Sequence, residues 1–118
     1  MFAEEPNMTN IVVFMTTATK QEAQKIVRML LGKHLIACAN TLGPVESQFW
    51  WQEKTQKASE FLVIMKSDQK LFEKLSEAIK EMHSYETPEI LALPIVKGWP
   101  PYLKWLKDTL HPAQTVKQ

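Results

Sequence analysis

The chain has 118 residues and 45% hydrophobic content, enough apolar material for one core and too little length for two ordinary domains. Its 14 Lys and Arg residues nearly balance its 13 Asp and Glu residues, so no basic surplus favours binding to nucleic acid. The longest apolar runs, 11–15 and 61–65, fall far short of the roughly 20 residues that span a bilayer. We therefore expect neither a nucleic-acid partner nor a membrane partner.

The single cysteine, Cys38, cannot form an internal disulfide. The first ten residues, MFAEEPNMTN, lack the charged and apolar regions of a secretory signal. Both observations predict a reducing, cytoplasmic setting.

The first half of the chain begins with a predicted strand over 11–15, whose residues are apolar on both faces, as is typical of a central strand. Thr19 followed by Glu22 fits a capping box, and apolar residues at helical spacing then predict a helix that ends near Gly32. A second strand is predicted over 35–42. Gly43-Pro44 marks a bulge, after which the strand resumes over 45–51.

The polar stretch 53–57 predicts a turn, and Glu60 opens a third strand over 61–65, again apolar on both faces. A second helix is predicted over 68–82 with Ser67 as its N-cap. A fourth strand follows over 89–96, and Pro94 places it at an edge or an interruption because proline lacks a ladder donor. Pro100 and Pro101 favour the first turn of a last helix that runs to Leu110.

The element order is therefore β-α-β-β-α-β with an additional C-terminal helix. With right-handed crossovers this order gives an α+β, ferredoxin-like sandwich. We expect a single domain over 10–110, an N-terminal leader over 1–9 and a C-terminal tail over 111–118. In such a fold two helices cover only one face of a four-stranded sheet.

Large aromatic side chains follow one another at Phe49, Trp50 and Trp51, so both faces of this strand carry aromatic groups. One helix layer cannot cover both faces, which predicts self-association through this surface. The alternative is that the last helix, with Trp105, folds over the open face within one molecule. We assign the four aromatic residues to an oligomer interface, because aromatic groups dominate the energetics of packing.

Three side chains suit copper or zinc: the Cys38 thiol, the His83 imidazole and the Met82 thioether. No Cys-x-x-Cys or His-x-x-x-His spacing joins them, so a site must gather ligands from distant segments or from neighbouring subunits. The alternatives are a buried, unreactive thiol at Cys38 and an imidazole at His83 that interacts with the dipole of its helix. His34, just after the first helix, has the same structural explanation.

Glu86 and Glu89 bracket Pro88, whose ring fixes the local backbone and so defines the direction of both carboxylates. This arrangement suits a binding site. An exposed pair of charges at the entrance of a strand is an equally good interpretation of the composition alone.

The chain resembles the CutA divalent-cation-tolerance proteins over about residues 10–110. The resemblance lies in Ile36-Ala37-Cys38-Ala39-Asn40, in Trp51-Gln52-x-Lys54, and most specifically in 81–90 (EMHSYETPEI), followed by Gly98 and Tyr102-Leu103-x-Trp105. It implies a ferredoxin-like subunit, a homotrimer that joins sheets edge to edge, and a role in tolerance to divalent metals such as copper.

The chemistry of the residue types, taken together with this resemblance, predicts which residues form the sites. Metal ligands would be His83, Cys38 and Glu89, and a ligand cleft would contain Glu60, Lys66, Tyr85, Glu86 and Lys54.

Two residues depart from the family pattern. Glu53 stands where the family usually has glycine, so a turn that needs positive φ would strain it, and a different turn type is expected. Ser84 stands where proline commonly follows the histidine, which is expected to free the segment that leaves the second helix and to make the placement of His83 less certain.

The function that we predict is a homotrimeric protein of divalent metal (copper) tolerance. It is expected to bind copper or another divalent cation weakly at or near subunit interfaces and to have no organic cofactor. The alternative is a signal-transduction module that binds a small anionic ligand in clefts between subunits, where Lys54 and Lys66 would matter most. We predict no enzymatic activity, because the chain has neither a phosphate-binding loop nor a nucleophile elbow.

Overall fold

A computed structural model of the chain describes residues 10–111. The elements, in chain order, are β1 (Asn10–Thr17), α1 (Lys20–Gly32), β2 (Cys38–Trp51), β3 (Lys54–Asp68), a 3₁₀ turn (Gln69–Leu71), α2 (Phe72–Met82), β4 (Ile90–Pro94) and α3 (Pro100–Leu110). The predicted leader over 1–9, and the predicted tail beyond residue 111, lie outside the described residues. Within the described range no helix is long and apolar enough to cross a membrane.

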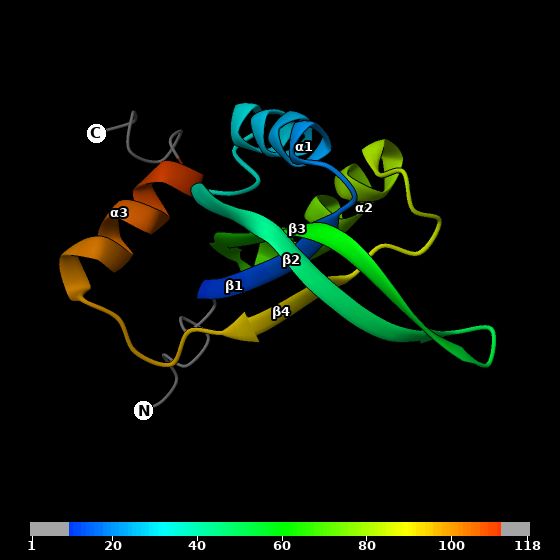
Figure 1. The fold of residues 1–118 in the computed structure, drawn as a ribbon. Coiled ribbons are helices and arrows are strands. Elements are labelled where there is room, and N and C mark those ends of the chain that lie inside the picture. Colours follow the sequence, from blue (N-terminus) through cyan, green and yellow to red (C-terminus); the bar gives the residue numbers. More distant parts are fainter. Residues whose placement is uncertain (1–9, 112–118) are drawn as a thin grey trace.

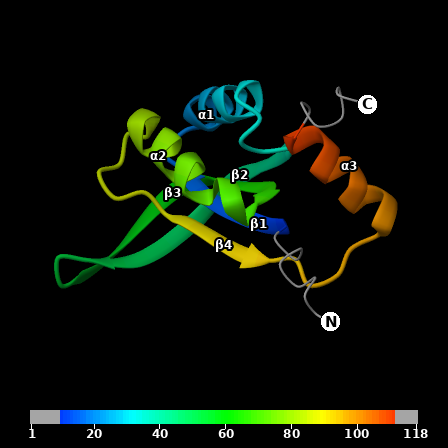
Figure 2. The ribbon, with the colours of Figure 1, turned by 180° about the vertical axis from the view of Figure 1, so that it is seen from behind.

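The four strands form one sheet in the order β2-β3-β1-β4, and each neighbouring pair is antiparallel. This arrangement confirms the predicted α+β fold and puts the two strands that are apolar on both faces, β1 and β3, at its centre. Figures 1 and 2 show α1 and α2 on the same side of the sheet and α3 beside the beginning of β2. β4 is an edge strand, as Pro94 predicts.

The core lies between the sheet and the first two helices. Its fully buried members are Val13, Met15, Ala23, Ile26, Leu30, Ile36, Val63, Met65, Leu75 and Ile79. A second, smaller cluster holds α3 through Leu106 and Leu110, which pack on Ala37 and Leu71. α3 reaches the face of the sheet opposite the other helices only at the start of β2, where Tyr102 contacts Cys38, and it leaves Leu42, Leu91 and Leu93 exposed.

The β2–β3 hairpin extends well beyond the body of the molecule (Figure 1). β1 pairs with β3 only from Phe61 onward, so residues 45–60 of the hairpin pair only with each other. We call this two-stranded extension, residues 45–60, the arm. The predicted bulge at Gly43-Pro44 is confirmed by the shift of register between Leu42 and Val45 at the base of the arm.

Three local predictions are wrong. Residues 54–57 belong to β3 rather than to a turn, since the turn consists of Gln52 and Glu53 alone, at φ values of 51° and 65°. Both central residues are therefore left-handed, and Glu53 adopts the conformation that was expected to be avoided. The second helix begins with a 3₁₀ turn capped by Asp68, whose carboxylate accepts from the Lys70 N–H at 2.8 Å, whereas Ser67 is buried and donates to the Leu35 carbonyl at 2.7 Å.

Candidate functional site

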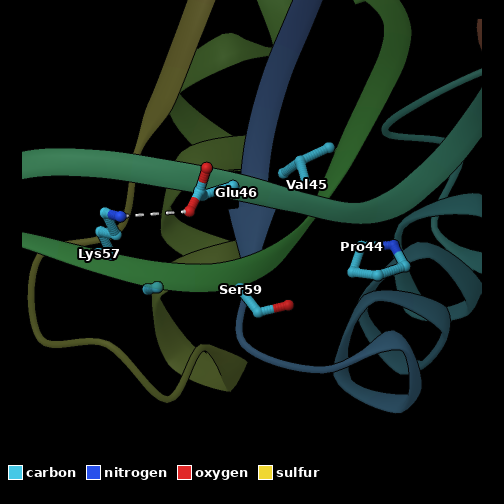
Figure 3. Close-up of a pocket in the computed structure, with 6 residues that line it drawn as sticks. Pro44, Val45, Glu46, Lys57 and Ser59 are labelled. Atoms are coloured by element: carbon cyan, nitrogen blue, oxygen red, sulfur yellow. Dashed lines mark ion pairs between the residues drawn. The ribbon is translucent and has the colours of Figure 1, made fainter.

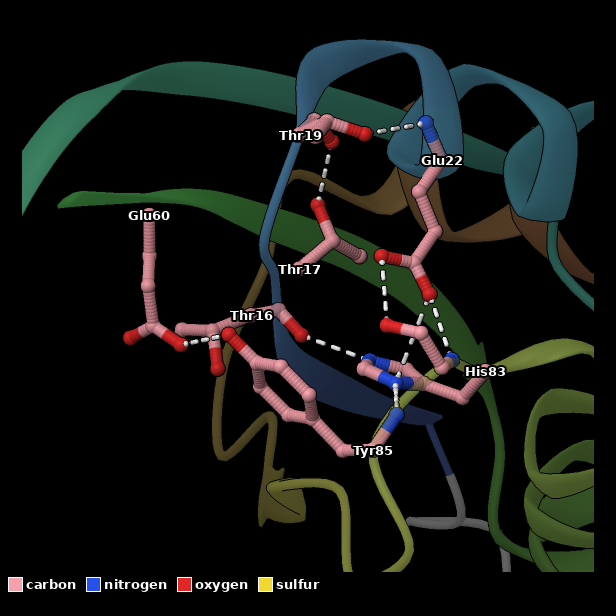
Figure 4. A network of polar contacts seen from close by, with 8 residues as sticks. Thr16, Thr17, Thr19, Glu22, Glu60, His83 and Tyr85 are labelled. Carbon is pink, nitrogen blue, oxygen red and sulfur yellow. Dashed lines mark hydrogen bonds and ion pairs between the residues drawn. The ribbon is translucent and has the colours of Figure 1, made fainter. Parts of the chain in front are cut away.

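His83 lies at the C-terminal end of α2, where its imidazole is buried and uses both ring nitrogens. Nε2 donates to the Thr16 carbonyl at 2.8 Å, and Nδ1 accepts the Tyr85 N–H at 3.0 Å (Figure 4). One nitrogen must carry a proton and the other a lone pair, so this arrangement selects the neutral ring. A metal ion at His83 would have to displace one of these hydrogen bonds.

Tyr85 links this segment to the base of the arm. Its hydroxyl donates to Glu60 Oε2 at 2.5 Å, and its ring centroid lies 4.8 Å from that of His83 (Figure 4). Burial raises the pKa of Tyr85, and the hydrogen bond to the Glu60 carboxylate raises it further. The phenol therefore stays protonated and remains a hydrogen-bond donor to Glu60, which is only 8% exposed.

Ser84 holds this segment in place instead of freeing it. Its N–H and hydroxyl donate to the two oxygens of Glu22, at 2.6 and 3.1 Å, and Glu22 Oε2 also lies 3.6 Å from His83 Nδ1. Proline at this position could not donate the N–H. The expectation that Ser84 loosens the loop is therefore wrong, because the departure adds a link between α1 and the exit of α2.

Glu22 also shows why the capping box is only half formed. Thr19 caps α1 by accepting the Glu22 N–H at 3.1 Å, as predicted. The Glu22 carboxylate does not return to the cap, because it binds Ser84, 62 residues away. Sequence reasoning therefore missed Glu22 as a residue of this network, and also Thr16, which contributes only its backbone carbonyl.

Cys38 lies at the start of β2, half-buried, in a second polar cluster. Its sulfur is 3.6 Å from the Tyr102 hydroxyl and 3.9 Å from Lys66 Nζ, which also donates to Asn40 at 3.4 Å. The hydrogen bond to Cys38, followed by burial, raises the pKa of Tyr102 to about 12. The thiol is thus neither fully buried nor without polar neighbours.

The predicted metal ligands are not gathered in one place. Cys38 lies in the same row of the sheet as Val12, whereas His83 contacts Thr16, about 13 Å further along β1 at 3.3 Å per residue. Glu89 is exposed just before β4. Among residues 10–111 no group of three or more His, Cys, Asp and Glu side chains is placed to hold a metal ion.

The predicted ligand cleft is brought together only in part. Glu60 and Tyr85 are in contact, whereas Lys66 belongs to the Cys38 cluster and Glu86 is exposed. Lys54 lies at the tip of the arm, about 40 Å from Lys66 along β3 at 3.3 Å per residue. One copy of the chain therefore does not unite the two lysines.

The aromatic residues of the arm are open to solvent in a single copy. Phe49 is 40% exposed, Trp50 74% and Trp51 56%. Trp105 on α3 is 44% exposed and stacks on Tyr102, with ring centroids 5.4 Å apart. The alternative in which the last helix hides these aromatics within one molecule is not what the structure shows.

Surface hollows on the described part of the chain also lie outside these clusters. One, of about 390 Å³, is on the arm and is lined by residues 44–46 and 57–59 (Figure 3). Its charged groups, Glu46 and Lys57, form an exposed ion pair at 3.8 Å, which contributes little to stability. Another, of about 490 Å³, lies between β4 and the start of α2. Neither hollow contains a residue of the predicted sites.

Comparisons with known proteins agree with this fold. A family model described as CutA1 divalent ion tolerance protein matches residues 11–109. The divalent-cation tolerance protein CutA of Archaeoglobus fulgidus is 39% identical over 99 residues, which cover 84% of this chain and 96% of that protein. Protein CutA 1, chloroplastic, of Oryza sativa subsp. japonica is 35% identical over 109 residues, which cover 92% of this chain and 62% of the rice protein.

Solved structures give the same result. The structure of CutA from Archaeoglobus fulgidus matches with a TM-score of 0.84 at 37% identity, covering 86% of this chain and 99% of that chain. The crystal structure of CutA1 from Oryza sativa matches with a TM-score of 0.83 at 36% identity, covering 86% and 95%. The family model extends from β1 to α3, the relatives and structures cover 84–92% of the chain, and this chain belongs to the CutA family of divalent-cation tolerance proteins.

Proposed function

We propose that this chain works as a homotrimer in divalent metal tolerance, and that it binds copper weakly at or near the contacts between subunits. The family supplies the role in tolerance to divalent cations. The assembly and the position of the metal are argued from the arm, from the open face of the sheet and from the scattered ligands.

The arm is the observation that carries the proposal. A two-stranded hairpin with no third strand and no helix against it is at best marginally stable in water. Here such a hairpin carries Phe49, Trp50 and Trp51, all at least 40% exposed. A neighbouring copy that covered these side chains would supply the burial that the arm lacks.

The sheet has a second uncovered surface, the face opposite α1 and α2, which we call the open face. Cross-strand partners share a face, so the register places these apolar side chains together: Val12, Phe14, Leu42, Leu62, Ile64, Leu91 and Leu93. Leu42, Leu91 and Leu93 are 45%, 56% and 50% exposed. An apolar surface of this kind favours association with further copies over exposure to water.

The metal proposal follows from where Cys38 lies. Its cross-strand partner is Lys66, which faces the same side as Ile64 and Leu62, so the thiol is on the open face. If open faces meet in the assembly, each copy brings one thiol to the contact. This supports a site shared between subunits, since one copy offers no set of three ligands within the described residues.

Two experiments test the proposal. Light scattering after gel filtration is expected to give the mass of a trimer for the wild type and a smaller mass for Leu91→Asp, which puts a charge on the open face. The matched control is Leu31→Asp, because Leu31 is 41% exposed on α1, away from that face. A wild type that runs as a monomer at micromolar concentration would refute the assembly.

Calorimetry with copper tests the ligands. The Cys38→Ala, His83→Ala double variant is expected to bind copper at least about tenfold more weakly than the wild type, as the loss of two ligands requires. His34→Asn is the control, since it removes an imidazole from an exposed position and retains a side chain that tolerates positive φ. Equal copper uptake by the double variant and the wild type would show that other groups bind the metal.

A further inference from the structure

Glu60, at the base of the arm, is largely buried, and its carboxylate has one hydrogen-bond partner among residues 10–111. Glu60 pairs across the sheet with Val45, and its residue is 8% exposed. Tyr85 donates to one oxygen; the other oxygen has no hydrogen bond or ion pair among residues 10–111, and Figure 4 shows it turned away from the network. This free oxygen is still reached by solvent, so a ligand can approach it, while the rest of the residue is largely removed from water. A compensating charge is favoured next to a carboxylate in such surroundings, because its partial desolvation is costly.

The neighbours of Glu60 do not neutralise it. Tyr85 is a neutral donor, and the bonding of both nitrogens of His83 selects an uncharged imidazole. Glu22, which lies 3.6 Å from His83, is a second carboxylate. None of the lysine and arginine residues in the described part of the chain forms an ion pair with Glu60. The local charge is therefore negative, with a vacant acceptor position.

We infer that Glu60 and Tyr85 form a receptor for a nitrogen cation, either an ammonium or a guanidinium group, which donates to the free oxygen of Glu60. The charge of the site disfavours the small anionic ligand of the alternative function at this position. A bare divalent ion needs several ligands, whereas within residues 10–111 no group of three ligating side chains exists. A nitrogen cation needs one carboxylate, with which it forms a charge-assisted hydrogen bond.

Two sources can supply such a group: a small amine or guanidine, or a Lys or Arg side chain of a second copy that packs at the base of the arm. The inference does not depend on copper binding, because Glu60 is not among the proposed metal ligands. The cation site can therefore be refuted while the copper proposal stands, and the copper proposal can be refuted while the cation site stands.

The first test uses free cations. Butylammonium and N-methylguanidinium are titrated against the wild type, Glu60→Gln and Glu46→Gln, with butanol and N-methylurea as uncharged analogues. The amide signal of Tyr85 in nitrogen–proton spectra is the readout. Glu46→Gln is the control, because it removes a carboxylate from the same hairpin at a position that is 64% exposed. A free cation is expected to move the signal of the wild type and of Glu46→Gln, with binding at least about tenfold weaker in Glu60→Gln.

The second test measures the oligomer. If a second copy supplies the cation, free amines leave the wild type unchanged and Glu60→Gln weakens self-association at least about tenfold, whereas Glu46→Gln does not. If Glu60→Gln fails to fold, Tyr85→Phe is used in its place, because this variant keeps the Glu60 carboxylate. It is expected to bind a free cation in preference to the uncharged analogue or, if a second copy supplies the cation, to form the same oligomer as the wild type. The inference is overturned if no cation binds in preference to its analogue and Glu60→Gln also associates like the wild type.

Discussion

Replacing Ser84 by proline removes the link between α1 and the loop that carries Tyr85. The substitution fits the backbone before it, since His83 has φ −79° and ψ 141°, the extended conformation that residues before proline favour. It deletes the N–H that donates to Glu22 at 2.6 Å and the hydroxyl that donates at 3.1 Å. The Glu22 side chain, 15% exposed, would lose both hydrogen bonds from Ser84 at once and keep only His83 nearby, at 3.6 Å.

The magnitude follows from these two bonds. A hydrogen bond to a charged group contributes about 1.5–3 kcal/mol, and we use the lower end because Ser84 is exposed. Proline restricts the unfolded chain and recovers about 0.4–1 kcal/mol. We therefore expect Ser84→Pro to lower the free energy of unfolding by about 2 kcal/mol, and Ser84→Ala, which keeps the N–H, to lower it by about 1 kcal/mol.

Urea denaturation of the wild type, both Ser84 variants and Glu22→Gln would measure these differences. All samples need the same protein concentration, since association makes the apparent stability concentration-dependent. A double-mutant cycle between Ser84→Ala and Glu22→Gln isolates the coupling of the two side chains. The reasoning fails if Ser84→Pro is as stable as the wild type or if the cycle gives no coupling.

Three further substitutions test the turn, the bulge and the Cys38 cluster. Glu53→Gly is expected to stabilise the hairpin by about 0.5–1 kcal/mol in thermal unfolding, because φ is 65° there, and a lower midpoint would contradict this. Gly43→Ala is expected to destabilise by about 1–3 kcal/mol, since φ is 154° and a Cβ would come within 2.5 Å of the Phe61 ring; unchanged stability would refute the clash. The pKa of Tyr102 is raised to about 12, so the stability that the phenol contributes is complete below about pH 10 and is lost as the pH rises through 12. Cys38→Ala is expected to lower this pKa, which an absorbance titration of the phenol measures. An unchanged titration would exclude the contact between Cys38 and Tyr102.

Much of the fold could be predicted because local signals and burial agree. At some positions the pattern of side chains is compatible with only one secondary structure. These positions are the Thr19 cap, the apolar stripes of α1 and α2 and the two central strands. The bulge could be predicted as well, since Gly43 and Pro44 interrupt an otherwise regular strand.

The start of β3 could not be predicted from the same signals. Residues 54–59 are polar except for Ala58, and all are exposed or half-buried, so no apolar alternation marks them as a strand. Their conformation depends on pairing with β2, which is a property of the register and not of the local sequence. The sequence of this stretch is that of a turn, and only its partner strand makes it extended.

The site was less predictable than the fold, because its decisive contacts join distant segments. His83, Tyr85 and Glu60 could be named, but their roles depend on Thr16 and Glu22, which are 67 and 62 residues from their partners. A backbone carbonyl leaves no mark in the sequence, and a glutamate in a capping-box position has a sufficient local explanation. The network therefore becomes visible only when the chain is folded.

The two faces of the sheet differ in how far their side chains are covered and how far their polar groups have partners. On the helix side the core is buried and α1 is capped by Thr19. On the open face and along the arm the same chain leaves apolar strands uncovered, a thiol without fellow ligands and, at Glu60, a carboxylate without a counter-charge. Each deficit is of a kind that a second molecule can satisfy: apolar area by packing, a thiol by shared coordination, a carboxylate by a cation. The thiol and the apolar side chains paired with Val12 and Phe14 share the open face of the sheet, so Leu91→Asp, which puts a charge on that face, is expected to impair association while leaving α1 and α2 folded.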